Sequence, residues 1–98
     1  MPRYLIERDI EGAGRLSPEE RQAISARSNE VLDQMRSEGQ HIQWDLSYIT
    51  DNAINCVYVA SSAEVIREHA RRGGFPVTKL SEIATLIDPV TGESPVRA

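Results

Sequence analysis

The residues of this sequence that could bind a ligand or a metal ion are two histidines, one cysteine and several aromatic residues. His69 lies in the segment "IREHARRGGFP" (66–76), where helical spacing places it on the same side as Ile66 and Ala70. An imidazole at an apolar position packs in a core, binds a metal, or acts as an acid or base in a pocket. The segment alone leaves these three roles open.

A second group of candidate residues lies on two predicted strands. Cys56 and Tyr58 alternate along one strand, so their side chains point to the same face. Trp44 and Tyr48 share one face of the preceding strand. We predict that these side chains form a pocket beneath His69, in which Tyr58, Trp44 and Tyr48 contact the ligand. A packed core with a small thiol, aromatic rings and a neutral histidine is the alternative.

Some of these residues are also candidate ligands of a metal ion. Imidazole and thiolate suit nickel, copper or zinc, so the candidate metal ligands are His69, Cys56 and His41. His41 starts a predicted strand, and a solvated histidine at a strand end is the alternative there. Cys56 with His69 as its base is the candidate nucleophilic couple. Because a cysteine in the middle of a strand is usually buried and inert, we assign no catalytic residue.

Composition excludes several classes of protein. The chain has 98 residues, a formal net charge of -4 and a pI near 5.1. Nucleic-acid binding needs a surplus of Lys and Arg, so we expect no nucleic-acid partner. No apolar run approaches the roughly 18 residues of a membrane span, and we expect a cytoplasmic protein with no membrane partner. On folding, a domain of this size buries only ~60–65% of the surface that its unfolded chain exposes, and pairing with a second copy would bury more. Its size therefore favours a homodimer.

Hydrophobic periodicity predicts four strands and two helices. The strands are expected at 2–10, 41–50, 53–61 and 78–88, and the helices at 18–38 and 62–74. In this order they form the split βαβ arrangement of a ferredoxin-like βαββαβ fold. We therefore predict an α+β protein with a four- or five-stranded antiparallel sheet, two helices on one face, and the first and third strands at the centre.

Serine residues predict where both helices begin. Ser17 is followed by Pro18 and by Glu20, which completes a capping box for the first helix. Ser61 and Glu64 have the same spacing at the second helix. We therefore expect the two helices to begin directly after Ser17 and Ser61.

The sheet face without helices is expected to meet a second copy of the chain. Leu5, Val57 and Val59 should lie on this face, which would otherwise expose them to water. We predict that two copies close it as a dimeric α+β barrel. The ferredoxin-like domain is expected to span 1–89, followed by a flexible tail at 90–98 that contains little to bury.

The chain also resembles a family of small ferredoxin-like dimers that includes a nickel-binding protein. The resemblance covers residues 2–89 and rests on "PRYLIERDIEGAG", "LSPEE", "QWDLSYITDNAINCVYVA" and "IREHARRGGFP" followed by "IDP". It implies a symmetric dimer and, in at least one member, divalent nickel bound for sequestration or detoxification. The family pattern W-x-H-S-Y is "WDLSY" here, with Leu46 at the histidine position, whereas Cys56, Tyr58 and His69 match.

Two functional hypotheses follow. The first is a dimeric protein, more a binder than an enzyme, that holds a divalent metal, nickel, for sequestration or homeostasis. The second is a small-molecule-binding protein or enzyme that uses a pocket between the second helix and the sheet around His69. A structural or regulatory dimer without a ligand is a third possibility. Leu46 removes one imidazole, which favours a core or organic-pocket role for His69 over an interior metal.

Overall fold

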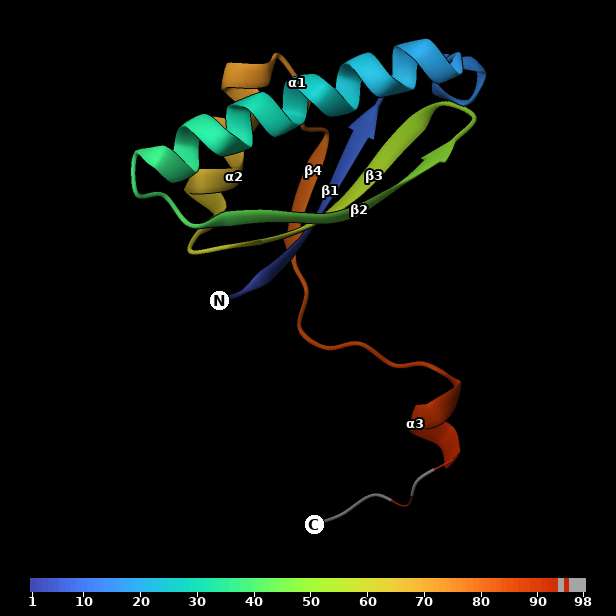
Figure 1. Cartoon of the computed structure of the whole chain (residues 1–98). Coiled ribbons are helices and arrows are strands. Elements are labelled where there is room, and N and C mark those ends of the chain that lie inside the picture. Colours follow the sequence, from blue (N-terminus) through green and yellow to red (C-terminus); the bar gives the residue numbers. More distant parts are fainter. Residues whose placement is uncertain (94, 96–98) are drawn as a thin grey trace.

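A four-stranded antiparallel sheet, covered on one face by two helices, forms the body of the computed structural model, which describes residues 1–93 and 95 (Figure 1). The strands are β1 Arg3–Asp9, β2 Ile42–Thr50, β3 Ala53–Ala60 and β4 Lys79–Glu82. The helices are α1 Pro18–Ser37, α2 Ala63–Gly73 and the short α3 Pro89–Glu93, with a 3-10 turn η1 at Ala13–Arg15. The strand order is β2-β3-β1-β4, so the central position predicted for β1 and β3 is confirmed.

The start of α1 is as predicted, whereas the start of α2 is not. The backbone N–H of Glu20 donates to Ser17 Oγ at 3.1 Å, and that of Ser17 donates to Glu20 Oε1 at 3.0 Å, which completes the capping box. At α2 the cap is Ser62, whose Oγ accepts from the backbone of Val65. Ser61 lies one residue before the cap position, and its backbone N–H extends the strand pairing by donating to the carbonyl of His41 at 3.1 Å.

Alternation along β1 and β3 divides the sheet into two chemically different faces. In β3, Cys56 and Tyr58 are buried beneath the helices, and the intervening Val57 and Val59 point to the face without helices. Leu5 of β1 pairs with Val57, so it lies on that open face as well. The predicted apolar group on the open face is therefore confirmed.

A β-bulge reverses the alternation of β2. Trp44 pairs with Tyr58 on the helix side, but the next paired residue is Leu46, which faces Val57 on the open side. Asp45 is the extra residue, and one extra residue moves every later side chain to the other face. The prediction that one face carries both Trp44 and Tyr48 is therefore wrong.

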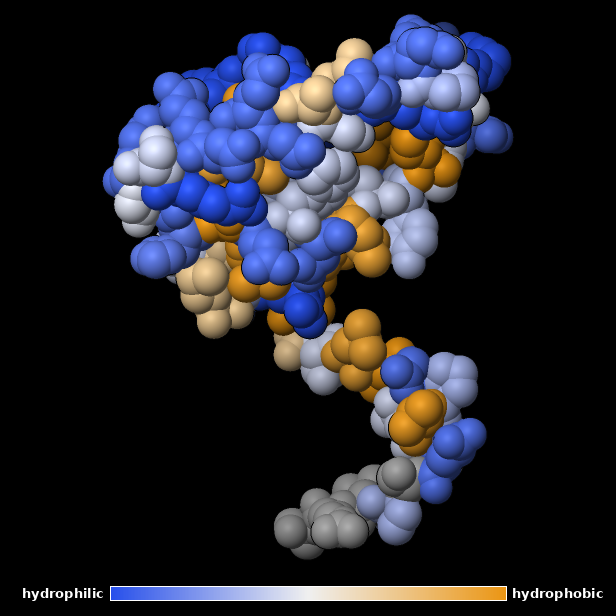
Figure 2. Space-filling view, in the orientation of Figure 1, coloured by the Kyte–Doolittle hydropathy of each residue, from blue (hydrophilic) through white to orange (hydrophobic). Residues whose placement is uncertain are grey.

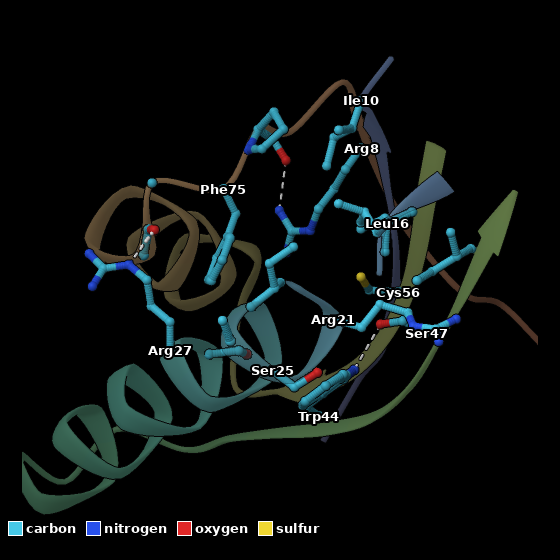
Figure 3. A pocket seen from close by; sticks show the side chains of 18 of the residues that line it. Arg8, Ile10, Leu16, Arg21, Ser25, Arg27, Trp44, Ser47, Cys56 and Phe75 are labelled. Carbon is cyan, nitrogen blue, oxygen red and sulfur yellow. Dashed lines mark hydrogen bonds between the residues drawn. The ribbon is translucent and has the colours of Figure 1, made fainter. Parts of the chain in front are cut away.

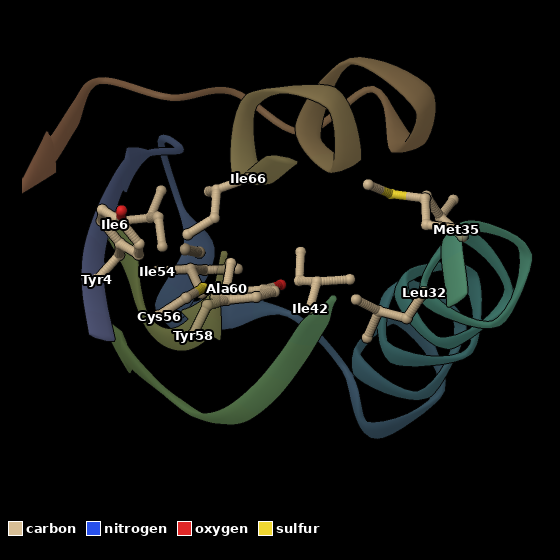
Figure 4. Packing of buried hydrophobic residues seen from close by; sticks show 12 residues of the cluster. Tyr4, Ile6, Leu32, Met35, Ile42, Ile54, Cys56, Tyr58, Ala60 and Ile66 are labelled. Atoms are coloured by element: carbon tan, nitrogen blue, oxygen red, sulfur yellow. The ribbon is translucent and has the colours of Figure 1, made fainter. Parts of the chain in front are cut away.

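The core lies between the helices and the face of the sheet that they cover, and α1 contributes to it at one end only (Figure 4). In α1 the buried residues are Ser28, Val31, Leu32 and Met35, and none of residues 18–27 is buried. The second half of α1 thus contributes nearly all of its packing. The bidentate ion pair between Arg72 and Glu38, at 2.8 and 2.9 Å, connects the ends of α2 and α1 there.

The last strand is shorter than the predicted 78–88. β4 ends at Glu82, which pairs with Tyr4. The backbone N–H of Ile83 then donates to the carbonyl of Arg3, the first residue of β1, at 2.8 Å, so the pairing stops where β1 begins. The chain then leaves the sheet and runs away from the body to α3 (Figure 1). Leu86, Ile87 and Val90 are exposed along it, and these apolar residues contrast with the hydrophilic surface over the helices (Figure 2). Part of the predicted flexible tail, residues 94 and 96–98, lies outside the described residues.

Candidate ligand-binding site

A cavity of about 620 Å³ opens between the first half of α1, the sheet and the chain that follows α2 (Figure 3). Its volume is within the ~300–1,000 Å³ typical of small-molecule sites. Its walls are largely apolar and include Ile10, Leu16, Ile24, Trp44, Ile49, Ile54 and Phe75. The cavity exists because α1 packs closely on the sheet only from Ser28 onward. It lies under α1, not under the second helix as predicted.

Arg8 is the buried charged group of this cavity. Arg8 lies on the same face of β1 as Tyr4 and Ile6, so its side chain points under the helices. It is only 3% exposed. The Nη1 group donates to the carbonyl of Pro76 at 2.7 Å, and the guanidinium carbon is 5.5 Å from the centre of the Phe75 ring. The Nη2 group is buried and has no hydrogen-bond partner among the described residues.

The sequence "GGFP" after α2 shapes the wall that holds Arg8. Gly74 has φ 74° and ends the helix in a left-handed conformation that glycine adopts without strain. A Cβ on Gly73 would overlap the ring of Phe75, so this glycine leaves the space in which the ring lies. Pro76 then offers its carbonyl to Arg8. Arg27 of α1 donates from Nε to the carbonyl of Gly73 at 2.9 Å and connects the two helices beside the cavity.

His69 packs behind the cavity wall and is fully buried. Its Nε2 shares a hydrogen bond of 3.3 Å with Ser28 Oγ, and its Nδ1 has no partner within the described residues. Its ring centre is 5.3 Å from that of Tyr58 and 5.5 Å from that of Phe75. Burial lowers the pKa of His69 to about 4, and the charge of Arg8 acts in the same direction. At neutral pH His69 is therefore uncharged.

Three of the other predicted site residues line the cavity. Cys56 and Tyr58 rise from β3, and Trp44 comes from β2, where its indole N–H donates to Ser47 Oγ at 2.9 Å. Burial raises the pKa of Tyr58, and the neighbouring hydroxyl of Ser28 opposes this shift. The site can therefore offer neutral polar groups and one buried cation to a ligand. Cys56 is a free, buried thiol, and His69 is hydrogen-bonded to Ser28 instead.

The remaining predicted site residues lie elsewhere. Tyr48 is 66% exposed on the open sheet face because of the bulge in β2. His41 is exposed just before β2, beside a separate shallow hollow lined by Arg36 and Gln40. Leu46, at the position where the resembling family carries histidine, also lies on the open face.

The described residues of one chain do not fit a nickel site. Among them, no group of three or more His, Cys, Asp or Glu side chains could hold a metal ion. The predicted ligand His41 is exposed, whereas Cys56 and His69 are buried. The imidazole of His69 has aromatic neighbours on two sides.

Sequence reasoning missed Arg8 and the role of α1. Alternation along the first strand could have identified Arg8, because it lies between Ile6 and Ile10 on the inward face, where the other residues are apolar. The hollow under α1 had no comparable signal, since Ile24 continues the same apolar stripe as the packed residues that follow it.

Comparisons with known proteins identify the family of the chain. No curated protein sequence matches it. The crystal structure of SCO4226 from Streptomyces coelicolor A3(2) superposes with a TM-score of 0.70 and 11% identity, covering 87% of this chain and 99% of that one. This likeness supports the α+β fold. None of the helices in the described part of the chain is long and apolar enough to cross a membrane. The model of the SCO4226-like nickel responsive protein family matches residues 4–83, and the chain therefore belongs to this family.

Proposed function

We propose that this chain is a binding protein that holds a small organic molecule in the cavity under α1. The observation that carries the proposal is a mostly apolar hollow of about 620 Å³ into which a few polar groups converge. Binding without turnover is favoured because Cys56 and His69, the candidate nucleophile and base, form no hydrogen bond with each other.

Filling the cavity tests this proposal. The uncharged dye N-phenyl-1-naphthylamine fluoresces on entering apolar sites, and we expect it to bind the native protein. Ile24→Phe adds bulk at the cavity wall and should weaken binding at least about tenfold. Ile87→Phe makes the same change on the exposed tail and should leave binding unaltered. Equal binding by both variants would show that the dye occupies another place.

Nickel binding is the second candidate function, and the family match over residues 4–83 is the observation that favours it. Since the described residues of one chain contain no group of three or more metal-binding side chains, and His41 is the exposed member of the predicted ligands, we propose that nickel binds at the surface through His41, with a second chain supplying another imidazole. Calorimetry on protein without a histidine tag tests this. His41→Gln should abolish the heat of nickel binding, whereas His69→Gln should preserve it. Absence of heat from the native protein up to millimolar nickel would exclude this function.

We further propose that the active form is a homodimer closed over the open sheet face, as in a ferredoxin-like α+β barrel. Leu5, Val57 and Val59 supply an apolar centre on that face, and the exposed side chains of Leu46 and Tyr48 extend it. Val57→Asp would place a carboxylate at this centre. Light scattering after gel filtration should then give the monomer mass of 10.9 kDa, and the native protein twice that mass. A native monomer would contradict the proposal.

A further inference from the structure

The charges around the cavity are opposite in sign to those of the chain. The whole sequence has 15 Asp and Glu against 11 Lys and Arg. The residues that line the cavity nevertheless include Arg8, Arg21 and Arg27 and no acidic residue. Positive groups gathered at an apolar cavity in an acidic protein favour a ligand that carries negative charge.

Arg8 is the group that such a ligand would reach. Its guanidinium is held by the carbonyl of Pro76 and by the face of the Phe75 ring, so its position is fixed before a ligand arrives. Within the described part of the chain, no carboxylate pairs with Arg8, and its Nη2 group is buried without a hydrogen-bond partner. A buried cation without a counter-charge is destabilising, and an anion bound beside it would relieve this cost.

The neighbouring groups restrict the kind of anion. Arg27 is already engaged by the carbonyls of Gly73 and Arg72, and Arg21 is exposed. One buried guanidinium in apolar surroundings is matched to a single negative charge. A carboxylate has the planar geometry that a guanidinium fork recognises. The aromatic ring of Trp44 and the aliphatic walls then suit an apolar body attached to that carboxylate.

We propose that the cavity binds a monoanionic carboxylic acid with an aromatic or branched apolar body, and that Arg8 binds its carboxylate. This inference rests on the proposed binding function and specifies its ligand class. The alternative is that Arg8 serves only to hold Pro76 and Phe75 in place. The two roles differ in one measurable respect, because a purely structural arginine would affect charged and uncharged ligands equally.

Two probes of the same shape separate these roles. 2-Naphthoate carries a carboxylate, and 2-naphthalenemethanol replaces it with an uncharged hydroxymethyl group. Both can be followed by fluorescence of Trp44, the single tryptophan of the chain, which lines the cavity. The native protein should bind naphthoate at least about tenfold more tightly than the alcohol, because a charge-assisted hydrogen bond is added.

Substitution of Arg8 assigns the preference to this residue. Arg8→Met should weaken binding of naphthoate at least about tenfold more than binding of the alcohol, so that the preference is lost. Arg8→Lys keeps the charge but not the planar fork, and should retain part of the preference. Arg67→Met on the exposed side of α2 is the matched control and should change neither affinity.

The outcomes distinguish this inference from the function on which it rests. Equal affinity of the native protein for both probes overturns the carboxylate inference and leaves organic-ligand binding in place. Binding of neither probe overturns the carboxylate inference, and the dye experiment then decides the fate of the binding function by itself. An equal loss of both probes in Arg8→Met shows that Arg8 only shapes the cavity. The native preference can be measured even if Arg8→Met does not fold.

Discussion

The second half of α1 presses Val31, Leu32 and Met35 onto the sheet, whereas the first half of the same helix stands above a cavity. At the packed end, Ile42 and Ala60 close the core from the sheet side. At the hollow end, the helix is held by its capping box and by the hydrogen bond from Arg27 to the chain after α2. One continuous helix can therefore provide stability at one end and leave space for a ligand at the other.

Shortening one side chain at each end of α1 should have unequal effects on stability. Met35 is fully buried, so Met35→Ala should lower the free energy of unfolding by about 2–5 kcal/mol. Ile24 is half-buried at the hollow end, and Ile24→Ala should cost less than about 1 kcal/mol. Urea unfolding curves of both variants give the two values. Similar losses would mean that both ends pack equally well.

The second prediction concerns His69, which lies between the two ends. The pKa of a histidine in an unfolded chain is near 6.5, and burial lowers that of His69 to about 4. Between these values the unfolded chain binds more protons than the folded one, so stability is complete above pH 6.5 and falls as the pH decreases toward 4. This contribution is on the order of 3 kcal/mol.

Unfolding in urea at pH 7 and pH 4 measures this effect. Carboxylates also titrate in this range, so the comparison is with His69→Gln, which cannot be protonated there. The variant should lose about 3 kcal/mol less between the two pH values than the native protein. An identical pH dependence of both proteins would contradict a neutral, buried His69.

The elements of this fold that have a local sequence pattern were predictable from the sequence. Alternation located β1 and β3, and Ser17 with Glu20 located the start of α1, because each signal is local. The bulge at Asp45 was not predictable from alternation, since an extra residue leaves the pattern of residue types unchanged. For the same reason, Tyr48 was placed on the wrong face.

The candidate site was predictable only in part. Trp44, Cys56 and Tyr58 do line the cavity, because their strand faces were assigned correctly. The position of the cavity depends on how far the first half of α1 lies from the sheet, and this distance is set by tertiary packing. Arg8 was identifiable as a charged residue at an inward position, but its unpaired Nη2 group is a property of the folded chain.

At the hollow end, the close contact between Gly73 and Phe75 can be tested by substitution. Gly73 is buried, and a Cβ there would overlap the ring of Phe75. Gly73→Ala should therefore displace this ring and lower the free energy of unfolding by about 1–3 kcal/mol. Gly92→Ala in α3 has open space around its Cβ and is the matched control. Thermal unfolding of both variants measures the difference, and equal melting temperatures would contradict the tight contact at Gly73.

The smallest effect is expected at the single tryptophan. Its indole N–H donates to Ser47 Oγ at 2.9 Å across the bulge of β2, so this bond fixes the aromatic wall of the cavity. Ser47→Ala should cost about 1 kcal/mol and shift the fluorescence of Trp44, because the indole loses a polar partner. Ser81→Ala changes a half-buried serine on β4 and should do neither. If the emission of Ser47→Ala is the same as that of the native protein, solvent at the hollow end replaces the lost partner, and the wall of the cavity is not held by this bond.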